Sequence, residues 1–182
     1  MNLEAFYEIT YGLYIVSSIF ENKESGFICN AVMQVTANPC QLAVAASKDN
    51  FTTELIQKSK KIAICALSKN TRLDVIGTFG YKSGREVNKF ANVQHIRTED
   101  NLPVLTENVL AWFHGEVVSE IDLGSHILFV AQVDNCEIAG KDHDALTYTY
   151  YREVLKGKSP KSAPTYMNPE NINHKKKEEN MK

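Results

Sequence analysis

Short β-type runs separated by turn residues dominate the chain between Tyr14 and about Val133. The runs are rich in valine, isoleucine and aromatic side chains and are bounded by Asn, Asp, Gly or Lys, which is typical of strands. Two of them are apolar at consecutive positions, as expected of strands covered on both faces. The predicted strands are Tyr14–Ile19, Gly26–Asn30, Leu42–Ala46, Ile62–Leu67, Val109–Val118 and His126–Val133, of which Leu42–Ala46 and Ile62–Leu67 are the doubly apolar ones.

Two segments have helical spacing instead. The first, Thr52–Ser59, follows Asn50, a residue type that caps helix N-termini. The second is Thr71–Phe79. Many strands with few, short helices predict a mainly β fold, a small antiparallel barrel with helical insertions. The residues expected on one side of each helix are Leu55, Ile56 and Ser59 in the first and Leu73, Ile76 and Phe79 in the second.

The chain changes character after Tyr151. A glycine and three prolines between residues 156 and 169 disfavour regular structure, and residues 174–182 are polar. A length of 182 residues suits one domain with its own hydrophobic core. We therefore predict one barrel domain over residues 1–155 and a C-terminal extension over 156–182 that ends in a partly disordered tail.

Composition and charge exclude several classes of protein. A net charge of -2 argues against a nucleic-acid or anionic-membrane partner, and no apolar run approaches the roughly 20 residues of a membrane span. The N-terminus lacks the pattern of a signal peptide. The four cysteines, at positions 29, 40, 65 and 136, form no C-x-x-C pair, which excludes the usual zinc-ribbon, rubredoxin and thioredoxin spacings. Reduced thiols and a cytoplasmic location are expected.

Two polar clusters are candidates for binding an anion. Ser47–Thr52 combines hydroxyls and a lysine with the N-terminus of a predicted helix, where the helix dipole favours negative charge. Residues 79–90 offer three cations, a hydroxyl and a flexible glycine. Each cluster also fits an ordinary turn with solvated cations, and neither contains a Walker A or dinucleotide-binding motif. The polar residues of the second cluster are Lys82, Ser83, Arg85 and Lys89, with Gly84 among them.

A third cluster, Asn30–Pro39, has small and amide residues between two apolar stretches, where an aromatic ring could lie against the backbone. Gln34 and Thr36 are two residues apart and would share one face of a strand. An ordinary barrel strand that turns at Asn38-Pro39 explains the same residues equally well.

The histidines show no H-x-x-x-H, H-x-E or cysteine pairing, so no metal site is predicted. There is also no G-x-S-x-G motif for a hydrolase. His126 begins a predicted strand, where it is either a pocket residue or a strand-end histidine with satisfied hydrogen bonds.

Taken in order, these segments resemble the flavin reductase-like domain family, most closely the branch of flavoredoxins and the N-terminal half of high-molecular-weight rubredoxins. The resemblance runs from about residue 5 to residue 166, and its specificity lies in the joint order of five matches. These are Leu13–Ser17, Asn30–Pro39, Ser47–Thr52, Phe79–Phe90 and Leu123–Val130.

The resemblance implies an FMN-binding split β-barrel, a homodimer with FMN near the subunit interface. His126 would lie near the flavin, where it could position a nicotinamide or tune the ring, and the family often has Asp where this chain has Ser125. The residues expected beside the isoalloxazine ring are Asn30, Ala31, Gln34, Val35 and Thr36. Those expected to hold the ribityl chain and phosphate are Ser47, Lys48, Asn50, Thr52, Ser83, Arg85 and Lys89.

The function implied is that of an oxidoreductase that passes electrons from NAD(P)H through bound FMN to free flavin, rubredoxin or a metal complex. Since the chain lacks the paired cysteines of rubredoxin, a rubredoxin partner would be a separate protein. Two alternatives stay open. One is a flavoredoxin-like electron carrier that does not itself oxidise NAD(P)H, and the other is a flavin-binding module without enzymatic activity.

Overall fold

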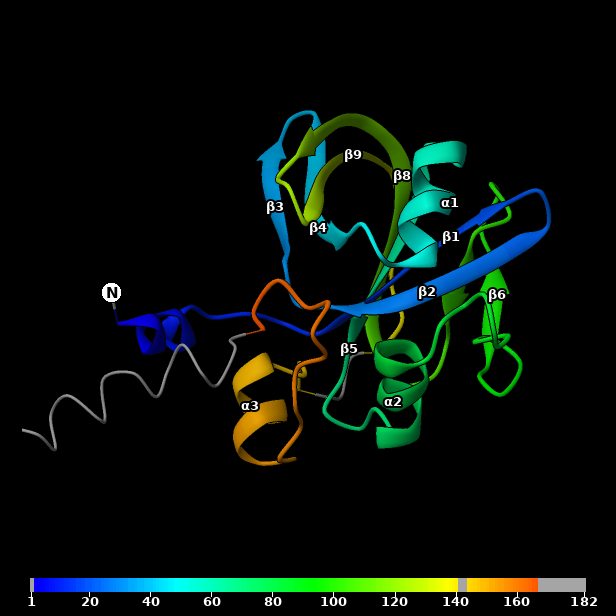
Figure 1. Ribbon diagram of the computed structural model, residues 1–182. Coiled ribbons are helices and arrows are strands. Elements are labelled where there is room, and N and C mark those ends of the chain that lie inside the picture. The colour runs from blue at the N-terminus through cyan, green and yellow to red at the C-terminus, as the bar shows by residue number, and fades with distance from the viewer. Residues whose placement is uncertain (1, 141–143, 167–182) are drawn as a thin grey trace, which may run out of the picture.

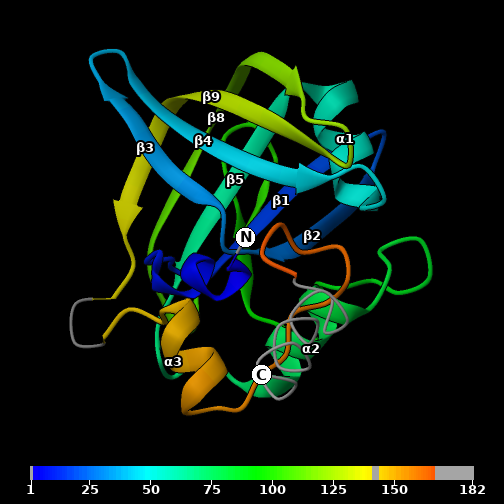
Figure 2. The ribbon, with the colours of Figure 1, turned by 60° about the vertical axis from the view of Figure 1, so that its left-hand side comes forward.

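The barrel is built from one antiparallel sheet of seven strands in the order β2-β1-β5-β8-β9-β4-β3, and β6 pairs with β7 separately. A computed structural model describes residues 2–140 and 144–166, and the curled sheet is seen in Figures 1 and 2. A mainly β fold is therefore confirmed. The strands are β1 (Tyr14–Phe20), β2 (Lys23–Cys29), β3 (Val32–Ala37), β4 (Cys40–Ser47), β5 (Lys61–Leu67), β6 (His95–Arg97), β7 (Pro103–Leu105), β8 (Val109–Asp122) and β9 (His126–Ile138). The helices are η1 (Leu3–Glu8), α1 (Phe51–Ser59), α2 (Leu73–Tyr81) and α3 (Tyr148–Glu153).

Strand β5 lies between two hydrophobic clusters. Its residues Ile62 and Ile64 belong to one cluster, and Ala63, Cys65 and Leu67 belong to the other. Successive side chains of a strand point to opposite faces, so both faces of β5 are buried. The prediction that this segment is covered on both sides is confirmed.

The helices close these two clusters. From α1, Ile56 packs in the cluster that contains Val44 and Phe129. From α2, Phe79 packs edge-on against Phe90 in the other cluster, with ring centroids 5.2 Å apart. Each helix therefore covers a different face of the sheet.

Helix α2 begins at Leu73, two residues later than predicted. The Thr71 hydroxyl donates a hydrogen bond to the Ser68 carbonyl at 2.7 Å, which holds Thr71 in the preceding turn. Leu73 is 57% exposed, whereas Ile76 and Phe79, which the pattern places on the same side of the helix, are buried. A residue in the first turn of a short helix can lie beyond the surface that the helix covers.

Strands β8 and β9 extend beyond their predicted ends at Val118 and Val133. The added residues are mostly polar and exposed, so the hydrophobic pattern alone underestimates both strands. Their pairing also shifts: His114 faces Asn135, but Gly115 faces Val133. Asp134 is thus the extra residue of a β-bulge, a feature that re-aims side chains.

The chain after α3 runs back across the barrel as residues 156–166, without a helix or strand (Figure 2). This agrees with the irregular structure predicted from the prolines. The predicted polar tail, residues 174–182, lies outside the described residues. Across the ranges that the structure describes, no helix is long and apolar enough to cross a membrane.

The cysteines divide into two buried and two exposed residues, and none of the four forms a disulfide. Burial raises the pKa of the Cys29 and Cys65 thiols to about 12. Because the thiolate is the reactive form, we expect iodoacetamide at pH 8 to alkylate only Cys40 and Cys136 in the folded protein. Peptide mass spectrometry would locate the label. Unfolding in urea should expose all four thiols, and rapid labelling of Cys65 in the native protein would contradict the structure.

Candidate functional site

The end of β4 and the start of β9 lie side by side, with Ser47 opposite His126 in the strand register. The backbone N–H of Lys48 donates to the Ser125 carbonyl at 3.1 Å, and its amino group lies 2.7 Å from Asp122. This ion pair, with a backbone N–H donated to the same carboxylate, lowers the pKa of Asp122. The turn between β8 and β9 is therefore held against the turn that leads into α1.

Both ring nitrogens of His126 have a partner. The Ser125 hydroxyl lies 2.8 Å from Nδ1, and the Ser162 carbonyl oxygen lies 3.2 Å from Nε2. A carbonyl only accepts, so Nε2 carries a proton and donates to the Ser162 oxygen. Ser125 thus orients the His126 ring.

Residues 156–166, the C-terminal segment, also contact Asn30, which is 5% exposed. The Asn30 amide donates to the Thr165 hydroxyl at 2.8 Å. Beneath this segment lies a cavity of about 30 Å³, lined in part by Asn30, Tyr151 and Thr165. Residues 156–166 therefore cover Asn30 on this side of the barrel.

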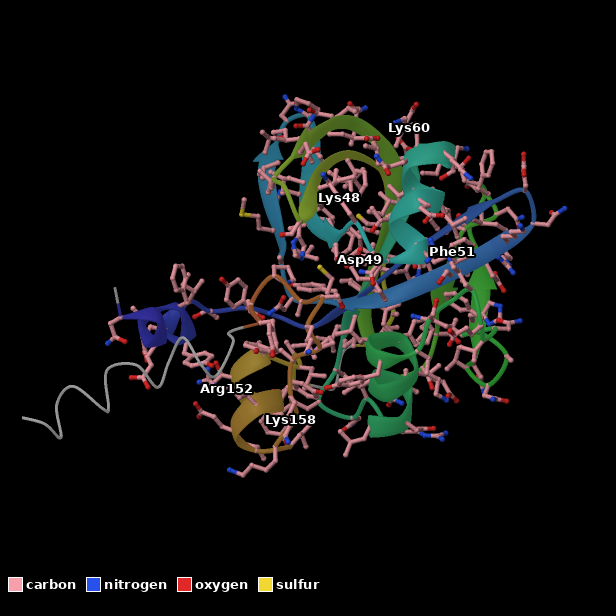
Figure 3. All side chains as sticks on the ribbon, in the orientation of Figure 1. Lys48, Asp49, Phe51, Lys60, Arg152 and Lys158 are labelled. Atoms are coloured by element: carbon pink, nitrogen blue, oxygen red, sulfur yellow. The ribbon has the colours of Figure 1, made fainter. Side chains whose placement is uncertain are left out.

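The turn between β4 and α1 carries Lys48 and Asp49, and Phe51 follows as the first residue of α1 (Figure 3). Hydrogen bonds within the turn hold it in place. The Thr53 hydroxyl donates to the Ser47 carbonyl at 2.7 Å, and the Ser47 hydroxyl accepts from the Asp49 N–H at 3.3 Å. Asn50 is the N-cap residue, as predicted, but its side chain makes no capping hydrogen bond. The Asn50 side-chain amide is thus not used by a cap, while the Thr53 N–H donates to the Asn50 carbonyl at 3.0 Å. Thr52 is only 1% exposed and does not face solvent.

Arg85, from the polar cluster of residues 79–90, contacts the first turn of α1. Its guanidinium pairs with Glu54 and lies 5.0 Å from the centre of the Phe51 ring. The Arg85 N–H donates to the Ser83 hydroxyl at 3.2 Å. Between this loop and the β1–β2 turn lies a cleft of about 600 Å³. It is lined by Asn22, Lys23, Glu24, Phe51, Gly84, Arg85, Glu86, Val87 and Asn88.

Lys89 differs from this arrangement, because its side chain is turned into the protein. It is 5% exposed, and its amino group donates to the carbonyls of Gly26 at 2.7 Å and Phe79 at 3.1 Å. Burial lowers its pKa to about 8. In this conformation Lys89 ties the loop to β2 and α2 and does not line the cleft, in contrast to the role expected from the sequence.

Gln34, Val35 and Thr36 are exposed on β3, away from the cluster around His126. Thr36 pairs with Gln41, six positions along β4 from Ser47, or ~20 Å of strand. The register also shifts between Gln34 and Thr36, so the regular alternation that the shared-face prediction assumed is interrupted. Within one chain, these three residues do not join the other candidates.

Several contacts of the site involve residues that the sequence did not single out. Ser162 and Thr165 contact His126 and Asn30 across 36 and 135 positions, and Asp122 pairs with Lys48 across 74. Such long-range contacts leave no local pattern in the sequence.

Comparison with known proteins gives consistent matches. The model of the family described as "Flavin reductase like domain" matches residues 6–158. The ferric-chelate reductase (NAD(P)H) of Archaeoglobus fulgidus is 37% identical over 91% of this chain and 98% of that protein. The high molecular weight rubredoxin of Moorella thermoacetica is 36% identical over 91% of this chain and 72% of that protein. The solved structure of the flavin reductase PheA2 superposes with a TM-score of 0.67 and 28% identity, over 79% of this chain and 88% of that one.

Proposed function

The chain belongs to the flavin reductase-like family, and on that premise we propose that it binds FMN between His126 and Arg85 and passes electrons from NAD(P)H through it to free flavin, a rubredoxin or a metal complex. The family, the split-barrel fold and an oxidoreductase activity follow from the comparisons. FMN, the residues that hold it and the electron acceptor are the proposed part.

One observation carries the proposal. The N-terminus of α1, where the Asn50 side chain makes no capping hydrogen bond, lies between His126 and Arg85. Ser47 pairs with His126 on one side of this turn, and Phe51 contacts Arg85 on the other. An elongated ligand could lie along this turn, with its ring beside His126 and its phosphate beside Arg85. The cleft at the Arg85 end, about 600 Å³, is within the usual range of ligand pockets.

The phosphate end would be held by groups that favour negative charge. The helix dipole of α1 places partial positive charge at Asn50, and the guanidinium of Arg85 offers donors in a planar fork beyond those used by Glu54. Ser83 and Lys48 add a hydroxyl and a second cation. Lys89 would not contact the phosphate. Its hydrogen bonds to the Gly26 and Phe79 carbonyls would hold the loop that carries Arg85 in place.

The ring end would lie by His126 and Asn30, under the C-terminal segment. Bound FMN would supply the redox chemistry, accepting electrons from NAD(P)H and releasing them to an acceptor. His126, oriented by Ser125, would present its Nε2 to the flavin ring or to the nicotinamide in place of the Ser162 carbonyl. The segment around Ser162 and Thr165 would exclude water while it covers the site.

The protein is further proposed to be a cytoplasmic homodimer, with β3 near the subunit interface. Met33 is 61% exposed and Val35 is 39% exposed, so this strand presents apolar side chains to solvent. An apolar edge of this kind suits contact with a second copy. Gln34, Val35 and Thr36 could then approach a flavin that they do not reach within one chain.

Anaerobic absorbance spectroscopy tests the reaction. FMN-loaded protein is titrated with NADH and then with NADPH, and we expect the oxidised flavin band at about 450 nm to bleach. A His126→Gln variant should keep its flavin but be reduced more slowly by the same nucleotide. Dithionite should reduce both proteins equally. If dithionite bleaches the flavin but neither nucleotide does, the protein is an electron carrier that needs another donor. A protein that binds no FMN would refute the proposed site.

A further inference from the structure

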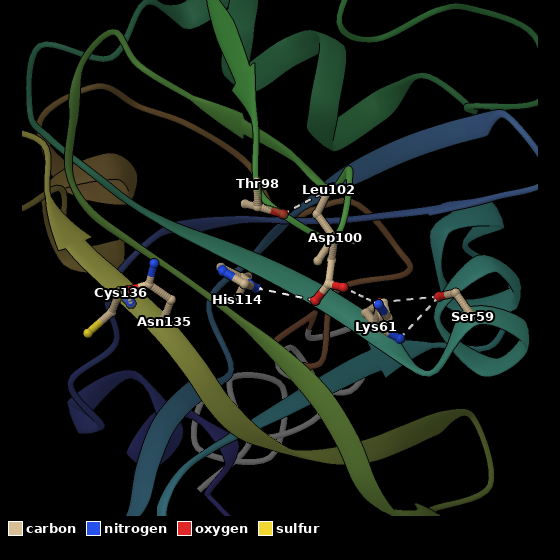
Figure 4. A network of polar contacts seen from close by, with 8 residues as sticks. All are labelled: Ser59, Lys61, Thr98, Asp100, Leu102, His114, Asn135 and Cys136. Atoms are coloured by element: carbon tan, nitrogen blue, oxygen red, sulfur yellow. Dashed lines mark hydrogen bonds and ion pairs between the residues drawn. The ribbon is translucent and has the colours of Figure 1, made fainter.

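A second group of chemically active side chains lies at the other end of β9 from His126. Asp100, His114 and Asp134 come from three separate segments, and each offers a ligand atom within 4.8 Å of the others. Figure 4 shows His114 and Asp100 in one polar network with Lys61. None of the three residues contributes to the proposed flavin site.

A β-bulge positions Asp134, and a hydrogen-bonded turn positions Asp100. Asp134 is the extra residue of the β8–β9 bulge, next to Asn135, the strand partner of His114. Asp100 lies in the turn between β6 and β7. That turn is fixed because the Leu102 N–H donates to the Thr98 hydroxyl at 3.2 Å. Bulges commonly re-aim a side chain next to a functional site.

His114 is the unusual member of the group. It is 4% exposed, and neither ring nitrogen has a hydrogen-bond partner within the part of the chain that the structure describes. The nearest charged atom is the Asp100 Oδ2, 3.8 Å from Nδ1, which is too long for a hydrogen bond. Leaving a buried polar atom without a partner is unfavourable, so the unpartnered imidazole of His114 points to a ligand at this position.

The charges favour a cation as that ligand. Lys61 pairs with Oδ1 of Asp100 and leaves Oδ2 directed toward His114. Asp134 is exposed and has no ion pair among the described residues. The two carboxylates of Asp100 and Asp134 and the one ammonium of Lys61 leave a net negative charge around the His114 ring.

We propose that Asp100, His114 and Asp134 bind a divalent transition-metal ion such as Zn²⁺, with water in its remaining positions. An imidazole with carboxylates suits first-row transition metals, whereas Ca²⁺ and Mg²⁺ prefer oxygen ligands only. The ion would bind one of the two unpartnered ring nitrogens of His114 and link the β6–β7 turn to the β8–β9 hairpin. Its role is structural and independent of the flavin site.

Isothermal titration of Zn²⁺ into FMN-loaded, chelator-treated protein tests the site. We expect one saturable site per chain and a rise in melting temperature on saturation, since an ion that binds only the folded state stabilises it. Asp134→Asn, an isosteric change at an exposed residue, should weaken binding by roughly tenfold or more, because even outer-shell partners of metals are worth about 10- to 100-fold. The matched control Asp74→Asn, at an exposed aspartate on α2, should leave binding unchanged.

Two further variants separate this site from the alternatives. Lys61→Gln removes the ammonium that competes for Asp100, so it should tighten Zn²⁺ binding, which loss of a purely structural contact would not do. Cys136→Ser should leave binding intact, since Figure 4 shows its sulfur pointing away from His114. The proposal is overturned if no saturable site is found, if Asp134→Asn and Asp100→Asn both bind as the parent does, or if Cys136→Ser abolishes binding.

Discussion

Replacing Arg85 with alanine is expected to weaken FMN binding by roughly 10- to 100-fold, because a charge-assisted hydrogen bond contributes about 1.5–3 kcal/mol. The change removes the guanidinium at the cleft and leaves the Glu54 carboxylate without its partner. An unpaired carboxylate beside a phosphate adds repulsion to the lost attraction. The main effect should be on flavin affinity, since Arg85 lies away from His126.

Fluorescence titration of apo-protein with FMN measures this loss, since free flavin and bound flavin differ in emission. Arg72→Ala serves as the control, because Arg72 also pairs with a nearby carboxylate, Asp74, but is not among the residues that line the cleft. Arg85→Lys should retain part of the affinity, because it keeps the charge but not the planar fork. Unchanged affinity in Arg85→Ala would remove Arg85 from the proposed phosphate site.

Gly115→Ala should be the most destabilising of the glycine substitutions in the barrel. A Cβ at this position would lie 1.8 Å from the carbonyl oxygen of Gln132 on the neighbouring strand. Backbone cannot yield as a flexible side chain does, so the β8–β9 bulge would have to shift. We expect a loss on the order of 3 kcal/mol or more, and a melting temperature lower by about 10 °C for a chain of this size.

Gly77→Ala in the middle of α2 is the matched comparison, since an added Cβ there meets no atom within 4 Å. Alanine is the better helix former by about 1 kcal/mol, so this variant should be slightly more stable than the parent. Thermal unfolding followed by circular dichroism distinguishes the two. Equal melting temperatures for both variants would show that β8 and β9 are not pressed together as the structure indicates.

The sequence predicted the strands best where burial is complete. β5 is apolar at every position that packs in a hydrophobic cluster. The predicted strand, Ile62–Leu67, therefore differs from the observed one, Lys61–Leu67, by one residue. β8 and β9 were predicted too short because their outer parts carry exposed polar residues such as Asp122 and Glu137, which do not contribute to a hydrophobic pattern. The bulge at Asp134 depends on how two strands pair, and a single strand's pattern does not record pairing.

The candidate site was predictable only in part, for the same reason. Hydroxyls and cations at Ser47–Thr52 and at Arg85 stand out locally, and the structure brings them to one end of α1. The direction in which Lys89 points could not be read from its neighbours, since its partners are carbonyls of β2 and α2. Asp100, His114 and Asp134 likewise meet only after the hairpin and the turn are in place.

The sheet order also has a consequence for how the chain acquires its shape during synthesis. β4 emerges early, but the strand it pairs with on its inner side, β9, begins 79 positions after β4 ends, at His126. Until the ribosome has made that strand, the β3–β4 hairpin has an open edge and an uncovered apolar face. The N-terminal hairpin of β1 and β2 pairs locally and can form at once. The barrel can therefore close only after β9 has been synthesised. We expect chaperones to bind nascent chains that are halted before His126.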